Sequence, residues 1–366
     1  MTQPRHIQPV VAARRPAILE ERFDEADVRV PRRSKYVGFR AVIKLIGTGE
    51  RGRRSLSFDE AHAAVEAIMT RSATQAQTGA FLQAMRLKGE DTTELAGMVQ
   101  ALRDRATPLQ ARTERTLVAC AGAYDGCVEA PALSLAAGVV AAAAGAGIVL
   151  HCGNPLGPKY GVTAAEVLAA CGGAQHPTAE QAEAMLERSG ITLVNAATLL
   201  SGWEEVTSIR DEVGLRGPLH SAEKLVDWFG ARRFVVGYTH TAYADRLCGA
   251  LDVLGAERAF AVRGVEGSDV MRPGRPVAHE HGFKLELPEQ LGDRLADAPG
   301  AEAAAALTAA ALDGRADRVV AYTVALNAGL RLYAAGVVPS VLRGISRARA
   351  VVADGSAQAT LAAMVG

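Results

Sequence analysis

The chain has 366 residues, with 40 Lys or Arg and 40 Asp or Glu, so its formal net charge at pH 7 is zero. This balance gives no overall field that attracts nucleic acid. Apolar residues make up 49% and charged residues 22%, which is typical of a globular protein, and the length allows two domains. The five cysteines show no CxxC spacing and the polar N-terminus does not resemble a signal peptide, so we expect a cytoplasmic protein with reduced thiols.

Residues 1–35 are rich in Arg, Pro and Glu and lack apolar periodicity, which predicts a disordered arm. From Arg29 to Arg54, nine Lys or Arg stand against one acid, Glu50. This density is typical of either a solvated arm or a surface that binds nucleic acid or an acidic partner.

Residues 36–109 predict a small helical domain. Apolar residues at helical spacing indicate helices over 39–46, from Ser57 onward, over 74–87, and from Asp91 to Pro108. Ser57 with Glu60, and Asp91 with Glu94, have the spacing of capping boxes.

Residues 110–366 predict an α/β domain, because short apolar runs alternate with helical ones from Arg115 onward. The expected strands are residues 116–119, 147–150, 191–194, 234–238 and 259–262. The expected helices are residues 164–170, 179–188, 241–254, 303–312, 319–335 and 341–354, with a closing helix after them. This alternation favours a mostly parallel sheet covered by helices.

The uncharged stretch 130–150 approaches the length of a membrane span. Pro131 and three glycines interrupt it, and alanine dominates its composition. A buried helix followed by a strand is therefore the favoured interpretation.

The segment 121–173 carries the most functional information. It contains a turn with Asp125 and Gly126, a helix of small residues, an apolar strand, and a Gly/Pro/Asn loop that opens another helix. This order gathers backbone amides and helix N-termini around one crevice, which favours an anion such as phosphate or pyrophosphate. The sequence therefore predicts a site for a phosphorylated small molecule.

Two long segments, 55–103 and 320–365, resemble the N-terminal helices and the final helices of glycosyltransferase family 3. Anthranilate phosphoribosyltransferase is the best-known member of this family, and the resemblance covers nearly all of residues 36–366. It implies a helical domain, a larger α/β domain, and a cleft where magnesium-bound phosphoribosyl pyrophosphate meets an aromatic amine, as in tryptophan biosynthesis. It also implies a homodimer formed through the helical domain.

The resemblance implies a set of substrate-binding residues in two loops. In the pyrophosphate loop, Asp125 and Gly126 match the family, whereas Ala123 and Tyr124 replace glycines and offer side chains that could obstruct phosphate. Ser134 is the hydroxyl left in the run that follows. The second loop keeps Gly153, Asn154, Lys159 and Gly161, with His151 at the position of the usual lysine. The alternative role for His151 is that of a strand-end histidine bonded to backbone.

The resemblance also implies an acceptor residue and a metal pair. Arg210 falls where an arginine contacts the acceptor carboxylate, and the alternative is a helix-surface ion pair with Asp211 or Glu212. Asp269 aligns with the first magnesium-binding acid of the family, Val270 replaces the second, and Glu266 is the candidate substitute.

Three functions follow as expectations. The first is a magnesium-dependent phosphoribosyltransferase with an aromatic amine or carboxylate acceptor. The second is a catalytically eroded paralogue that binds single-stranded nucleic acid through the Arg29–Arg54 cluster. The third is nucleoside phosphorolysis, because the run from Ser221 to Leu225 slightly resembles the pattern of pyrimidine nucleoside phosphorylases, although the chain lacks the additional C-terminal domain of those enzymes.

Overall fold

The computed structural model describes residues 36–288, residue 295 and residues 297–366. The predicted arm, residues 1–35, lies outside the described residues, and with it four of the nine basic residues between Arg29 and Arg54.

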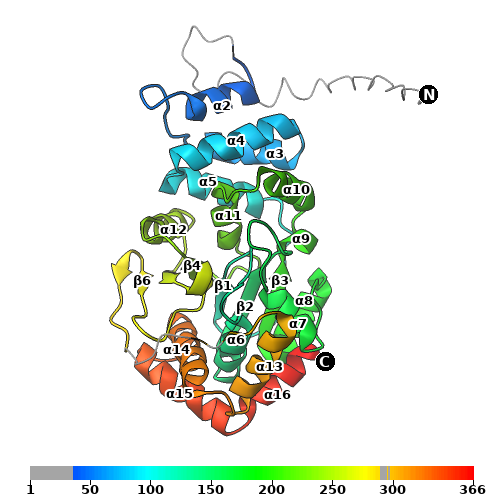
Figure 1. Cartoon of the computed structure of the whole chain (residues 1–366), viewed down its shortest axis with the longest axis vertical. Coiled ribbons are helices and arrows are strands. Elements are labelled where there is room, and N and C mark those ends of the chain that lie inside the picture. Colours follow the sequence, from blue (N-terminus) through cyan, green and yellow to red (C-terminus); the bar gives the residue numbers. More distant parts are fainter. Residues whose placement is uncertain (1–35, 289–294, 296) are drawn as a thin grey trace, which may run out of the picture.

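Four helices form a layer at one end of the molecule, at the top of Figure 1. They are α2 (Phe39–Gly47), α3 (Phe58–Met69), α4 (Gln75–Lys88) and α5 (Thr92–Arg103). Helix α3 packs against α5, and α2 packs against α4. The predicted capping boxes of α3 and α5 are present, and Thr74 with Gln77 forms a third at the start of α4. Each box satisfies backbone amides that a helix N-terminus leaves without partners.

A seven-stranded sheet in the order β3-β2-β1-β4-β5-β6-β7 forms the centre of the rest of the chain. The strands are β1 (Leu117–Ala121), β2 (Gly147–Cys152), β3 (Ile191–Asn195), β4 (Arg233–Tyr238), β5 (Arg258–Arg263), β6 (Ala278–Glu280) and β7 (Phe283–Lys284). The first five strands of that order are parallel, whereas β6 and β7 are antiparallel, which confirms the predicted mostly parallel sheet. The strand order reverses between β1 and β4, and open α/β sheets bind ligands at the carboxyl ends of strands at such a point.

The sheet separates two apolar cores. Alternate residues of one strand enter different cores: Ala119 of β1 belongs to the core shared with α2–α5, and Val118 and Cys120 to the core on the opposite face. The first core also includes α12 (Ala242–Val253). The second is built from α6 (Ser134–Ala143), α7 (Ala164–Ala170), α13 (Ala301–Leu312), α14 (Arg318–Ala334), α15 (Val341–Ala353) and α16 (Ser356–Val365), with part of α8 (Ala179–Ser189). Burial on both faces explains why the parallel strands are continuous apolar runs.

A segment after β3 returns to the helical layer. It contains α9 (Ala196–Leu199), α10 (Trp203–Val213), α11 (Pro218–Ala222) and the short 3-10 helix η1 (Glu223–Leu225). Helix α10 packs against α3 and α4, and α11 packs against α4 and α5, while η1 contacts both α5 and β4. Figure 1 shows α10 beside α5, and α11 between α5 and the strands. The returning segment is thereby packed against the helical layer, and η1 joins it to the sheet.

Residues 130–150 form α6 and β2, as expected of a buried helix followed by a strand. Within the described residues, no helix has the length and apolar character required to cross a membrane. All five cysteines are unpaired thiols.

The crossing of α14 and α15 gives a test of the packing. A Cβ atom on Gly344 would lie 2.5 Å from the carbonyl oxygen of Gly329 and 2.6 Å from its Cα atom. We therefore expect Gly344→Ala to force the helices apart and lower the free energy of unfolding by ~1–3 kcal/mol, measured by urea denaturation. The control is Gly49→Ala, because a Cβ atom on Gly49 would meet nothing within 4 Å. Equal stability of the two variants would contradict the close crossing.

Candidate active site

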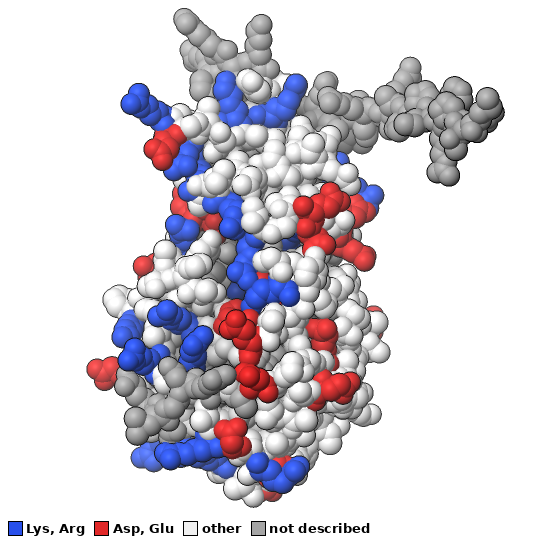
Figure 2. Space-filling model, in the orientation of Figure 1, with Lys and Arg blue, Asp and Glu red and all other residues white. Residues whose placement is uncertain are grey.

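The loops that follow β1, β2 and β5 meet at the carboxyl ends of the strands. A Cβ atom on Gly122, just after β1, would lie 3.0 Å from the Oδ1 atom of Asp269 in the loop after β5. On the face shown in Figure 2, basic side chains gather between the helical layer and the sheet, with acidic side chains directly beneath them. The site is therefore one of paired opposite charges.

The turn after β1 and the loop after β2 are joined by backbone hydrogen bonds. Cys127 and Val162 exchange two bonds of 2.9 and 2.8 Å, and the Gly161 amide donates to the Asp125 carbonyl at 2.8 Å. Gly126 has a φ of 69°, and a Cβ atom there would lie 2.1 Å from the Gly161 carbonyl oxygen. No larger residue fits this contact, so Gly126 holds the two predicted phosphate-binding loops together.

Lys159 lies at the junction of these loops. Its Nζ atom donates to the Gly126 carbonyl at 2.8 Å and lies 3.9 Å from the Oδ1 atom of Asp125. The Asp125 carboxylate also accepts from Arg216, whose Nε atom is 2.8 Å away. Arg216 belongs to the segment that returns to the helical layer, so that segment fixes the orientation of the buried Asp125 carboxylate.

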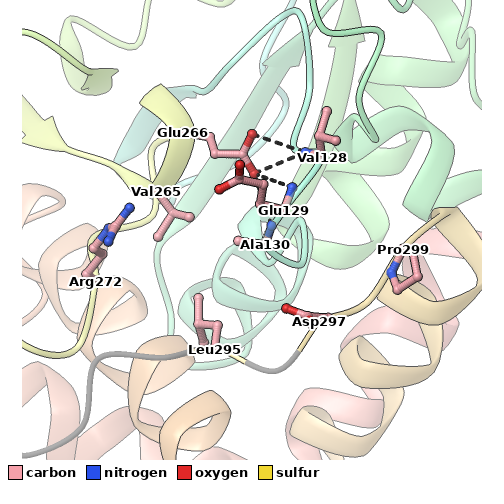
Figure 3. A pocket seen from close by; sticks show the side chains of 9 residues that line it. All are labelled: Val128, Glu129, Ala130, Val265, Glu266, Arg272, Leu295, Asp297 and Pro299. Atoms are coloured by element: carbon pink, nitrogen blue, oxygen red, sulfur yellow. Dashed lines mark hydrogen bonds between the residues drawn. The ribbon is translucent and has the colours of Figure 1, made fainter.

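Three consecutive backbone amides, those of Val128, Glu129 and Ala130, form what we call the amide nest. All three donate to the carboxylate of Glu266, at 2.9 to 3.1 Å (Figure 3). Lys159 Nζ donates to the same carboxylate at 2.9 Å. Partial burial raises the pKa of Glu266, but the hydrogen bonds from Lys159 and the nest outweigh it, so the pKa is below its ordinary value. Such a nest is an anion-binding arrangement, and here a side chain of the protein provides the anion.

Asp269 and Ser134 are brought together in the interior. The Asp269 carboxylate accepts from the Ser134 hydroxyl at 2.9 Å and from Arg331 of α14. Asp269 and Arg331 are both 0% exposed. The Oδ1 atom of Asp269 has no hydrogen-bond partner among the described residues. In the described part of the chain, no group of three or more His, Cys, Asp or Glu is arranged to hold a metal ion.

Arg210 points into a small pocket beside the loop after β2, and it does not pair with its helix neighbours. It is 3% exposed, its Nη1 atom lies 3.1 Å from the Oε2 atom of Glu223, and its guanidinium lies 4.9 Å from the Trp203 ring. Trp203 Nε1 donates to Glu223 at 3.3 Å. The helix-surface ion pair considered for Arg210 is absent, because its acidic partner is Glu223 of η1.

The predicted residues Gly153 and Asn154 border the same pocket. Asn154 accepts a hydrogen bond from Asn195 at 3.1 Å. A Cβ atom on Gly153 would lie 3.1 Å from the Oε1 atom of Glu223, so a side chain at this position would press on that carboxylate. Glycine at position 153 therefore lets Glu223 approach the loop.

His151, at the end of β2, is buried among rings. Its ring packs edge-on against Tyr124 and Trp228, with centroids 6.1 and 5.4 Å away. Within the part of the chain that the structure describes, neither ring nitrogen has a hydrogen-bond partner, so the alternative of a backbone-bonded histidine does not hold. Burial, with a smaller contribution from the Lys224 charge, lowers the pKa of His151 from 6.5 to about 3. A neutral His151 cannot replace the charge of the family's lysine.

Sequence reasoning missed Trp203, and it named Glu223 and Lys224 only within the run that resembles nucleoside phosphorylases, without a role at this site. Lys224 is partly buried, and its Nζ atom donates to the carbonyl oxygens of Gly237 at 2.9 Å and Gly267 at 3.3 Å. Burial lowers its pKa to about 8. The signal available in the sequence was the adjacent pair of opposite charges, Glu223 and Lys224.

The burial of His151 predicts a pH dependence. Between pH 6.5 and about 3 the unfolded chain binds a proton that the folded chain does not, so stability falls as the pH falls through this window, by ~1.4 kcal/mol per pH unit. We expect wild type to lose ~2 kcal/mol more than His151→Leu between pH 7 and pH 5 in urea unfolding. The control is His240→Leu at an exposed position. Equal losses in wild type and His151→Leu would contradict the neutral, buried ring.

Two family models match the chain. One, described as the helical bundle domain of a glycosyl transferase family, matches residues 40–106, and the other, described as the a/b domain of that family, matches residues 126–358. The anthranilate phosphoribosyltransferase of Geobacillus kaustophilus is 31% identical over 307 residues, which cover 81% of this chain and 89% of the relative. That of Rhodospirillum rubrum is 32% identical over 342 residues, covering 89% and 94%.

Solved structures agree with this relationship. The anthranilate phosphoribosyltransferase of Thermus thermophilus has a TM-score of 0.76 and 30% identity, covering 85% of this chain and 95% of that one. A Saccharomyces cerevisiae anthranilate phosphoribosyltransferase in complex with PRPP and Mg has a TM-score of 0.75, covering 89% and 96%, and its 17% identity shows the common fold alone. The chain therefore belongs to the glycosyl transferase family that combines a helical bundle domain with an α/β domain, a family of enzymes that includes the anthranilate phosphoribosyltransferases.

Proposed function

We propose that this protein transfers a phosphoribosyl group from phosphoribosyl pyrophosphate to an aromatic nitrogen acceptor. The observation that carries the proposal is the anion site at the strand ends, where the amide nest and Lys159 hold one carboxylate with hydrogen bonds of 2.9 to 3.1 Å. The relatives' activity supports the choice of substrate, because the named relatives about 30% identical to this chain are anthranilate phosphoribosyltransferases.

In this proposal a phosphate group of the substrate replaces Glu266 on the amide nest. A phosphate offers several strong acceptor oxygens to the same three amides and to Lys159. Glu266 has a φ of 52°, a backbone conformation that few residues other than glycine adopt, and its side chain is the only anion that these amides bind among the described contacts. The Glu266 carboxylate therefore occupies the amide nest until a phosphate of the substrate displaces it.

Magnesium enters with the substrate in this proposal. Mg²⁺ prefers one or two carboxylates together with phosphate oxygens and water. The Oδ1 atom of Asp269, which has no partner and faces Gly122, and the carboxylate of Glu266 once it leaves the nest suit an ion carried by pyrophosphate. Among the described residues they do not form a site for an ion held by the protein alone. The metal would neutralise charge on the departing pyrophosphate.

The protein's own contribution is positioning and electrostatic stabilisation. As pyrophosphate leaves, the sugar C1 atom gains positive character, and no covalent bond to the protein is needed. Lys159 and the nest stabilise negative charge on the leaving group, while Asp125, oriented by Arg216, and Asn154 hold the sugar-phosphate. Neutral His151 lies in the wall of the site and transfers no proton near pH 7.

The first test is calorimetric titration of phosphoribosyl pyrophosphate with magnesium. We expect Lys159→Met to weaken binding at least tenfold, or ~1.4 kcal/mol, because the variant loses the charge at the nest. The matched control is Lys284→Met, a change of the same kind at an exposed position on β7. Absence of heat and of any thermal shift in wild type at millimolar ligand would overturn the proposed function.

The second test concerns the exchange at the nest. We expect Glu266→Gln to bind inorganic pyrophosphate at least fivefold tighter than wild type in a chelator-containing buffer, because the competing carboxylate is gone. Glu129→Gln removes the same charge from an exposed residue in the same 590 Å³ pocket and serves as the control. Unchanged affinity in Glu266→Gln, or an equal gain in the control, would mean that the carboxylate does not hold the phosphate position.

Neither the named relatives nor the contacts of the described residues support nucleic-acid binding or a homodimer. Nothing in the named relatives favours the binding of nucleic acid, and the homodimer through the helical layer stays a prediction. Val37, next to α2, is 51% exposed, as a residue at such an interface would be in the isolated chain. Light scattering of the intact protein measures its oligomeric state directly.

A further inference from the structure

Lys224 reaches the strand ends from the returning segment. It belongs to η1, which contacts α5 and β4, and the next carbonyl, that of Leu225, accepts from Arg103 at 2.9 Å. The Lys224 Nζ atom donates to the carbonyl oxygens of Gly237, near the end of β4, and of Gly267, in the 3-10 turn η2 (Val265–Gly267) after β5. The ammonium group therefore lies where the carboxyl ends of β4 and β5 meet.

Two lysines from different parts of the chain donate to the same turn. Lys159 donates to the Glu266 carbonyl at 3.3 Å, and Lys224 donates to the next carbonyl, that of Gly267, also at 3.3 Å. Successive residues are about 3.8 Å apart along the backbone, so the two ammonium groups lie within roughly 10 Å of each other. One diphosphate can span this distance, with each of its phosphates bonded to one ammonium group.

Lys224 has no acidic partner of its own. The acids whose charges act on it are each bonded to an arginine: Asp125 to Arg216, whose charge also acts on it, Asp269 to Arg331, and Glu223 to Arg210. Lys224 forms no ion pair with a described residue, and its two carbonyl contacts leave one of three N–H groups available. Because the residue is partly exposed, an anionic ligand can reach this charge.

The rings that surround Lys224 are neutral near pH 7. Its Nζ atom lies 5.6 Å from the centre of the Tyr124 ring, and burial raises the pKa of that phenol. Burial lowers the pKa of His151 and of His220, and the Lys224 charge contributes to both shifts. Lys224 therefore supplies at this position a positive charge that neutral His151 cannot supply.

From these contacts, and resting on the proposed function, we infer that Lys224 binds the second phosphate of a pyrophosphate group whose first phosphate occupies the amide nest. Lys159 and Lys224 then hold one phosphate each, beside adjacent carbonyls of η2. This contact makes Lys224 a specificity-determining residue, because a single phosphate on the nest reaches Lys159 and not Lys224. The site thereby favours diphosphates over monophosphates.

The test compares inorganic phosphate with inorganic pyrophosphate by calorimetric titration in a chelator-containing buffer. We expect Lys224→Met to lose roughly tenfold in affinity for pyrophosphate and to keep the affinity of wild type for phosphate. Lys159→Met, at the nest itself, loses affinity for both probes. The matched control is Lys284→Met, at an exposed position on β7, which binds both probes as wild type does.

A pH series separates a charge contact from a structural role of Lys224. Burial lowers the pKa of Lys224 to about 8, so the ammonium charge is present at pH 7 and largely lost at pH 9. In the ratio of wild-type to Lys224→Met affinity for pyrophosphate, the ionisation of the ligand cancels. We expect this ratio to fall about fivefold from pH 7 to pH 9. A ratio that stays constant overturns the inference.

Other outcomes also overturn the inference. They are equal losses for both probes in Lys224→Met, no loss in that variant, and, without any variant, equal affinity of wild type for phosphate and pyrophosphate. The titration with phosphoribosyl pyrophosphate distinguishes failure of the proposed function. Selective pyrophosphate binding without phosphoribosyl pyrophosphate binding overturns that function and supports the two-lysine site, whereas phosphoribosyl pyrophosphate binding that Lys224→Met leaves unchanged overturns only the role of Lys224.

Discussion

The buried ion pair of Asp269 and Arg331 is the contact on which the site depends. Neither side chain is exposed, and the pair joins the loop after β5 to α14, while Ser134 brings in the start of α6. Gly122, after β1, packs directly against Asp269. An unpaired charge at this depth would be strongly destabilising, so pairing forces these segments of the chain to meet in one arrangement.

The same requirement governs the charges nearer the surface of the site. Asp125 is paired with Arg216, Glu266 with Lys159 and the amide nest, and Glu223 with Arg210. In the absence of ligand, every one of these acids therefore has a partner within the chain. Under the proposed function, an anionic substrate therefore competes with a carboxylate of the protein for its binding groups. Its binding free energy is the difference between two similar interactions, which makes the affinity sensitive to single acidic residues.

The elements with strong local patterns could be predicted from the sequence, and those that depend on tertiary contacts could not. The five parallel strands lie within about two residues of their expected positions, because continuous apolar runs and capping residues are local features. Helix α10 was not predicted. Its buried face consists of Trp203, Val206 and Arg210, and an arginine in that stripe gives the segment a polar appearance.

Residue types at the site were more predictable than their partners. The turn with Asp125 and Gly126 and the loop with Lys159 are together, as the order of strands and loops required. The partner of Arg210, Glu223, could not be predicted from the sequence. It lies 13 residues further along the chain, and its position depends on how α11 packs against the helical layer. Whether Glu266 binds a metal or backbone amides likewise depends on loop geometry that no spacing rule contains.

The departures from the family pattern lie at both ends of the site, because Val270 stands at the expected metal position while Tyr124 reaches from the pyrophosphate loop into the pocket beside Arg210. Tyr124, which replaces a glycine of the family, is 3% exposed, and its ring packs against His151 and His220. The same residue lines the pocket that holds Glu223. The residues that match the family, Asp125, Gly126 and Lys159, surround the anion instead. Substitutions at the acceptor end alter which molecule is bound, whereas those at the anion end alter the shared chemistry, so the choice of acceptor and the binding of phosphoribosyl pyrophosphate are separate properties of this chain and need separate measurements.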